Sequence, residues 1–244
     1  MLTLIDYSLH ILPGLLLLGA LYFLYKGKQA MAFRIFLLIL AFMLMRDAMT
    51  VHNLWELGTH NGVLWIRFIN DPLILVSLGL ASLVFAVLVL ATNKQMKSYL
   101  KWGKFTPKTL LYGLLGAGAV AAPLLIAYQF TPLAERGGSV ALGLLPALLA
   151  ITLLGNFMEE LLFRGYLQGY LEKLYKPLLA ALLSALTFAA AHIFLAFIAT
   201  DVGIALLIFT LYEGLVCAFL RMRYGLWPAV VAHGVGVLLV VSGL

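Results

Sequence analysis

Three charged side chains, Glu159, Glu160 and Arg164, lie along an otherwise apolar run of about residues 139–163 and at its end. On a helix, Glu160 and Arg164 are one turn apart and share a face. Arginine stays protonated, so it can neutralise a neighbouring carboxylate inside an apolar medium. Glu159 lies about 100° around the same helix, away from that pair. We therefore predict that Glu160 and Arg164 form a structural pair and that Glu159 is free to act as a general base.

Two histidines in later apolar runs extend this pattern. His192 follows Phe188 and three alanines, small residues that let helices approach closely, and His233 precedes Gly234. A glutamate on one helix and a histidine on each of two others can activate water and bind an oxyanion. The same three side chains, Glu159, His192 and His233, can equally provide three ligands to zinc.

Each of these residues has a plainer interpretation when taken alone. A single histidine within a membrane span is more often a hydrogen-bond donor between helices, and a glutamate one turn from an arginine is often a structural ion pair. Charges within a span cost about 2.5–3.5 kcal/mol each on insertion scales, so chains seldom carry them without a purpose. The joint occurrence of these residues on consecutive runs therefore favours catalysis.

The composition predicts a membrane protein. Hydrophobic residues make up 64% of the 244 residues and charged residues 11%, whereas a soluble domain carries about 25% charged residues. The formal charge of +6 is explained by basic cytoplasmic loops, so we predict no nucleic-acid partner. The single cysteine, Cys217, lies in an apolar run and is interpreted as a small buried side chain.

A membrane span needs about 20 apolar residues. We predict an all-α, polytopic protein of about eight spans, near residues 8–25, 31–45, 72–92, 109–130, 139–163, 177–199, 202–220 and 226–244. Residues 46–71 form the longest polar connection, and Trp55 and Trp65 suit an interfacial segment there. Residues 1–108 are taken as N-terminal spans of unassigned role, and residues 109–244 as the catalytic core.

The basic residues give an orientation. With the first loop, which contains Lys26 and Lys28, placed in the cytoplasm, only Arg46, Arg67 and Arg136 of the 16 basic residues fall on the opposite side. Basic loops face the cytoplasm in most membrane proteins. We therefore predict that both termini are non-cytoplasmic.

The C-terminal motifs resemble those of the CPBP intramembrane proteases, which include the Ras-converting CAAX endopeptidases. Residues 159–165, Glu-Glu-Leu-Leu-Phe-Arg-Gly, match the E-E-x-x-x-R signature, and residues 188–192 match F-x-x-x-H. The stretch from Gly214 to His233 is similar to the third conserved region. The resemblance covers about 100 residues, from the fifth span to the end, with its motifs within 156–237.

This resemblance implies a bundle of eight helices around an intramembrane cavity. It implies cleavage of a membrane-associated protein or peptide in the lipid bilayer, near its C-terminus or membrane segment. Glu159 with His192 would activate water, Glu160 and Arg164 would shape the site, and His233 would help to stabilise the oxyanion. The family has been interpreted both as metalloproteases and as glutamate proteases. We favour no cofactor, because Glu160 held by Arg164 is a poorer metal ligand, and keep zinc on Glu159, His192 and His233 as the alternative.

One position departs from the family pattern. The last motif usually ends in asparagine or another polar residue, but here it ends in Val237, which cannot donate a hydrogen bond. Loss of one oxyanion donor typically lowers the rate by about 10²–10³. Asn156 and Glu213, which are polar and lie within spans, are the candidates to replace it.

Two further function classes follow from these observations. Val237 favours a catalytically weak or inactive scaffold, such as a regulator or an immunity protein. Glutamate and histidine within spans also mark proton relays in transporters. We rank the transporter last because the sequence contains no inverted repeat.

Overall fold

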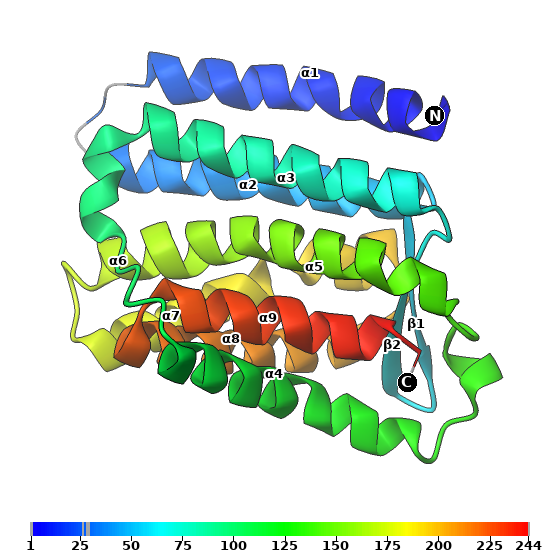
Figure 1. Cartoon of the computed structure of the whole chain (residues 1–244). Helices are drawn as coiled ribbons and strands as arrows, with labels where there is room; N and C mark the ends of the chain where they lie inside the picture. Colours follow the sequence, from blue (N-terminus) through cyan, green and yellow to red (C-terminus); the bar gives the residue numbers. More distant parts are fainter. Residues whose placement is uncertain (1, 26, 28–29, 244) are drawn as a thin grey trace.

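The computed structural model describes residues 2–25, 27 and 30–243, so Lys26 and Lys28 lie outside the described residues. Within these residues the protein is a bundle of long helices with one β-hairpin (Figure 1). The elements in chain order are α1 (Leu2–Leu24), α2 (Ala30–Val51), β1 (Trp55–His60), β2 (Val63–Phe68), α3 (Pro72–Thr92), η1 (Lys94–Tyr99), α4 (Pro107–Tyr128), η2 (Leu133–Arg136), η3 (Leu142–Leu144), α5 (Leu145–Glu160), η4 (Leu161–Leu167), α6 (Gln168–Leu171), α7 (Pro177–Ala190), η5 (Leu195–Ala199), α8 (Ile204–Tyr224) and α9 (Leu226–Val241).

The helices are those of a multi-pass membrane protein, as predicted. Six helical segments of the described chain are long and apolar enough to cross a membrane: 2–24, 72–92, 107–128, 142–171, 177–199 and 204–224. Helix α9 is apolar but shorter. Helix α2 has the length of a span, but it carries Arg34, Arg46 and Asp47. The predicted spans therefore correspond to the observed helices, although their ends differ by several residues.

The bundle places the two ends of the chain at the same end of the molecule (Figure 1). Helix α1 lies outermost, next to α2 and α3, and α5 lies between this group and the C-terminal helices. The β-hairpin stands at the end of the bundle that carries both termini. This arrangement agrees with an even number of crossings. The side of the membrane on which the termini lie stays a prediction.

The fold is nearly all-α, as predicted, and the hairpin is its one addition among the described residues. Strands β1 and β2 pair antiparallel within residues 46–71, the segment expected to be a polar interfacial connection. Asn61 and Gly62 form the two-residue turn, both with positive φ, as a type I′ turn requires. The indole of Trp65 lies over Gly58 on the opposite strand, where a Cβ atom would come within 2.4 Å of the ring. The sequence Asn-Gly between strand-forming residues is a local signal for this hairpin.

Glycines bring α9 close to α4 and fix where α9 begins. A Cβ atom on Gly113 would lie 2.7 Å from Val231, and one on Gly236 would lie 2.9 Å from Val120. At the start of α9, the amide of Leu226 donates to the carbonyl of Lys101. Gly225 there has φ of 97° and ψ of −176°, a region that residues other than glycine almost never adopt. These contacts set the position of α9, and with it that of His233.

We predict that Gly225→Ala destabilises the protein by about 1–3 kcal/mol, because alanine is strained at this φ and ψ and its Cβ atom would lie 2.4 Å from the Cα atom of Gly103. The expected result is a lower midpoint of thermal unfolding in detergent, followed by tryptophan fluorescence. Gly118→Ala in α4 is the matched control, since nothing lies within 4 Å of its added Cβ atom. Equal midpoints for the two variants would contradict this account.

Candidate active site

The two glutamates lie where the α5 helix changes its winding. Residues 145–171 are continuously helical, but residues 161–167 form a π-helix, η4. Such widened turns occur frequently at functional sites. Glu159 and Glu160 are the last residues of α5, and Arg164 lies within η4. A second π-helix, η5, begins three residues after His192. The backbone is thus irregular on both elements that carry the F-x-x-x-H and E-E-x-x-x-R motifs.

Glu160 and Arg164 form the buried pair that their spacing predicted. Both side chains are fully buried, and Arg164 Nη1 lies 2.9 Å from Glu160 Oε1. The guanidinium also lies over the ring of Phe188, with its Cζ atom 4.1 Å from the centroid. Gly214 of α8 leaves room for it, because a Cβ atom there would lie 3.3 Å from Nη2. Charge neutralisation and a cation–π contact therefore hold Arg164 in the interior.

His233 lies among three carboxylates. Its Nδ1 is 2.9 Å from Glu160 Oε1, while its Nε2 is 3.4 Å from Glu159 Oε2 and 3.5 Å from Glu213 Oε1. Ionised carboxylates only accept hydrogen bonds. A doubly protonated ring suits these neighbours on both nitrogens. The structure thus brings together Glu159, Glu160, Glu213 and His233.

Arg46 of α2 joins Glu159 to His192. Its Nη1 donates to His192 Nε2 at 2.9 Å and lies 3.4 Å from Glu159 Oε1. A guanidinium cannot accept a hydrogen bond, so His192 Nε2 is the acceptor, and His192 Nδ1 donates to the carbonyl of Phe188 at 2.8 Å. His192 is therefore a neutral imidazole in this arrangement.

The remaining donors of Arg46 are also used. Its Nε and Nη2 both lie 2.8 Å from Asp47 Oδ1. Its Nη2 also donates to the carbonyl of Ala191 at 2.8 Å. Arg46 and Asp47 are both buried. This position corrects the prediction that Arg46 belongs to a polar connection at the outer membrane surface.

Sequence reasoning missed Arg46 because the second span was ended at residue 45. The sequence carries a signal for it, since an Arg-Asp pair that follows eleven consecutive apolar residues, 35–45, can be neutralised within a longer helix. Its actual partners are about 110 and 145 positions away in the chain. Spacing within one helix relates only residues a few positions apart. The sequence could therefore suggest a buried Arg46–Asp47 pair, but not its contacts with Glu159 and His192.

A cavity of about 220 Å³ adjoins these residues. Its polar lining includes Glu159, His192, Glu213, His233 and Asn156, whereas Glu160 and Arg164 do not line it. Most of its wall is apolar and comes from α1, α2, α3 and the hairpin as well as from the C-terminal helices, including Tyr7, Phe42, Ile66, Leu78 and Val237. The amide nitrogen of Asn156 is buried and has no hydrogen-bond partner among the described residues. Asn156 thus lines the cavity one turn before Glu159 and carries an unpaired donor in the described structure.

The donor atoms fit a metal poorly in this arrangement. His192 Nε2 already accepts from the cationic guanidinium of Arg46, which a metal ion bound there would have to displace. Glu159, His192 and His233 are not among the groups of the described chain whose ligand atoms lie within 4.8 Å of one another. One such buried group, Glu160, Cys217 and His233, is present, but Arg164 already neutralises its carboxylate.

The sequence comparisons agree with the motifs. Residues 141–239 match the family described as type II CAAX prenyl endopeptidase Rce1-like. Comparison with curated proteins and with solved structures gave no match. The family match covers the motif-bearing helices and confirms the resemblance to CPBP proteases, but it does not reach α1–α4 or Arg46.

We predict that Glu160→Gln and Glu159→Gln differ in their effect on stability. Removing the charge of Glu160 leaves Arg164 buried beside a neutral amide, and breaking a buried pair typically costs about 3–5 kcal/mol. Glu159 makes longer contacts and faces the cavity, so we expect a smaller loss. Thermal unfolding in detergent at one scan rate measures both. A loss for Glu159→Gln as large as that for Glu160→Gln would contradict the division of roles.

Proposed function

We infer that this chain, whose residues 141–239 belong to the Rce1-like family of CAAX prenyl endopeptidases, is an intramembrane endopeptidase that uses Glu159 as its general base. The family supports an intramembrane protease as the class of activity. The observation that carries the finer assignment is the lining of the cavity. Of the two adjacent glutamates, Glu159 faces the cavity while Glu160 is held behind it by Arg164 and His233.

The proposed reaction is hydrolysis of a peptide bond. Glu159 takes a proton from a water molecule, and the water oxygen attacks the carbonyl carbon of the substrate. The carbonyl becomes an oxyanion in a tetrahedral intermediate. When the carbon–nitrogen bond breaks, Glu159 returns the proton to the leaving amine. The products are a carboxylate-terminated and an amine-terminated peptide, and Glu159 ends in its starting form.

Arg46 and His192 position the base in this proposal. The guanidinium places a permanent positive charge beside Glu159, with Arg46 Nη1 3.4 Å from Glu159 Oε1. Because Nε2 of His192 is an acceptor, it can take a hydrogen bond from the attacking water once the substrate displaces Arg46 from it. In this proposal, water activation by Glu159 with His192 therefore also involves Arg46 of α2.

Two groups are suited to stabilise the oxyanion. His233 carries N–H groups directed at carboxylates within the site, and Asn156 has a buried amide nitrogen with no partner in the described chain. Val237 lines the same cavity. Asn156 can thus supply the donor that Val237 lacks. We assign Glu213 to charge balance beside His233, because its carboxylate oxygen lies 3.5 Å from Nε2.

The cavity wall supports a membrane-associated protein or peptide as the substrate. Its apolar side chains come from several helices and the hairpin, including Phe42, Met49, Leu57 and Ile66. Burial of apolar surface would hold a hydrophobic segment or a lipid group against them. We propose cleavage near the C-terminus of such a substrate.

We predict that Glu159→Gln abolishes cleavage without loss of the fold, because glutamine cannot take the proton from water. Purified protein in detergent would be assayed with a panel of membrane peptides, with and without a strong zinc chelator, beside His192→Ala. Loss of cleavage in both variants, with wild-type cleavage unaffected by the chelator, is the expected result. Chelator-sensitive cleavage would instead support a metalloprotease, and full activity of Glu159→Gln would exclude Glu159 as the base.

We predict that Asn156→Ala lowers kcat by about 10²–10³ with little change in KM, since one oxyanion donor is removed. Thr152→Val is the matched control: Thr152 also lines the cavity, but its hydroxyl is already bonded to the carbonyl of Leu148. Adding Val237→Asn to the Asn156→Ala variant should restore part of the rate. Unchanged kcat in Asn156→Ala would assign the oxyanion to other donors, and a wild type inactive on every peptide would favour the scaffold function.

A further inference from the structure

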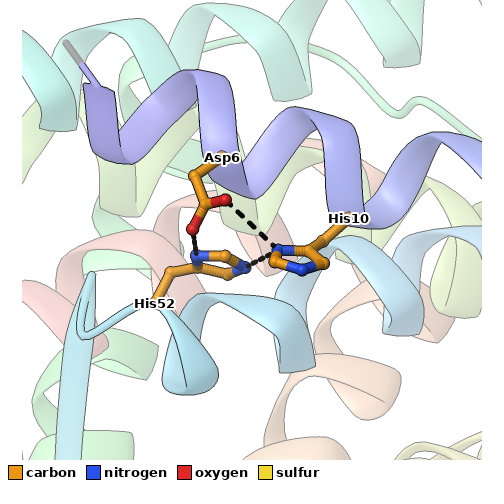
Figure 2. Close-up of side chains that lie close together, drawn as sticks. All are labelled: Asp6, His10 and His52. Atoms are coloured by element: carbon orange, nitrogen blue, oxygen red, sulfur yellow. Dashed lines mark hydrogen bonds and ion pairs between the residues drawn. The ribbon is translucent and has the colours of Figure 1, made fainter.

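A second cluster of polar side chains lies away from the cavity residues, between the start of α1 and the end of α2. Asp6 and His10 are one turn apart on α1, and His52 follows α2 (Figure 2). The three side chains point toward one another, and no carboxylate or histidine of the E-E-x-x-x-R or F-x-x-x-H motif is among them. The family match at residues 141–239 does not include them.

The distances within this cluster suit a metal ion. His10 Nδ1 and His52 Nε2 are 3.1 Å apart, and Asp6 Oδ1 is 3.7 Å from His10 Nδ1. One ligand atom of each residue lies within 4.8 Å of the others. Tetrahedral zinc with bonds of about 2.0–2.1 Å requires its ligand atoms to be about 3.3 Å apart. Small side-chain adjustments would therefore place all three atoms around one ion.

Asp6 lies next to both histidines. Its Oδ2 is 3.3 Å from His52 Nδ1 and its Oδ1 is 3.7 Å from His10 Nδ1. The two imidazoles share a hydrogen bond between His10 Nδ1 and His52 Nε2. The His52 side chain is 6% exposed while those of Asp6 and His10 are over 60% exposed. The cluster is thus buried at His52 and open to solution at Asp6 and His10.

We propose that Asp6, His10 and His52 bind a divalent transition-metal ion such as Zn²⁺, through Asp6 Oδ1, His10 Nδ1 and His52 Nε2, with water in the fourth position. Two imidazoles and one carboxylate are ligands that zinc, cobalt and nickel accept. The bound ion ties α1 to α2. This link would affect the position of α1 beside the cavity. Tyr7, next to Asp6, donates to the carbonyl of Met45 at 2.7 Å, and it lines the cavity together with Ser8 and Ile11.

The proposal predicts one metal site in the full-length protein, purified in detergent without a polyhistidine tag and stripped of metal. Titration with Co²⁺, followed by its visible absorption, and with Zn²⁺, followed by calorimetry, measures binding. We expect one equivalent for the wild type. His10→Ala and His52→Ala should each bind at least about tenfold more weakly, and Asp6→Asn about 10–100-fold more weakly. Zn²⁺ should also raise the unfolding midpoint of the wild type but not that of His10→Ala.

Two controls separate this site from other histidines. His60→Ala removes a histidine of the hairpin that pairs with Glu135 of η2, and this variant should bind metal like the wild type. His192→Ala tests the cavity and should also retain binding. Retention of the metal in the His10→Ala/His52→Ala double variant, or its loss in His192→Ala, would overturn the proposal. So would a wild type that binds no Co²⁺ or Zn²⁺ above background. His10 is exposed, so His10→Ala gives a folded test even if His52→Ala disturbs α2.

Discussion

The organisation of this site depends on the neutralisation of charge in an interior that lacks water. An isolated ion in an apolar medium is very costly, so each buried charge needs a partner with good geometry. Two arginines on different elements are such partners for the two glutamates. Arg164 neutralises Glu160 from within the same helix, whereas Arg46 reaches Glu159 from α2. Because Arg46 also holds the carbonyl of Ala191, a shift of α2 would leave polar groups unpaired on three elements. The charges therefore fix the relative positions of α2, α5 and α7.

Adjacent carboxylates on one helix acquire different environments because they point about 100° apart. Glu160 faces η4 and α9, where the arginine and the histidine enclose it. Glu159 faces the cavity and α2, with contacts of 3.4 Å on each oxygen. A carboxylate in the first environment is fixed, and one in the second has room for a water molecule beside it. The consecutive placement of the two residues is thus what allows one to be enclosed by charged partners and the other to line the cavity.

Features set by residues close together in the sequence were predictable, whereas contacts between residues far apart in the sequence were not. The helices follow from apolar length, and the Glu160–Arg164 pair follows from their spacing. The sequence predicts Arg46 in a polar connection, because its partners Glu159 and His192 become neighbours only in the folded bundle. The hairpin has a local signal in Asn61-Gly62, but the surrounding tryptophans and charges also suit an interfacial segment without strands. No helical spacing relates His10 to His52, and only the packing of α1 against α2 brings His10 Nδ1 to 3.1 Å from His52 Nε2.

The cavity combines two parts of the chain that differ in their chemistry. Its carboxylates and histidines come from residues within the family match, while Arg46 and much of the apolar wall come from α1–α3 and the hairpin. In the proposed reaction a peptide bond reaches Glu159, and the flanking side chains of the substrate lie against this apolar wall. We therefore expect substrate preference to depend on the N-terminal helices more than on the motif residues. Since α1 is the least buried of the candidate spans, its position beside the cavity depends strongly on the few polar contacts that it makes with α2. A change at those contacts would alter the shape of the wall without altering any group that takes part in the reaction.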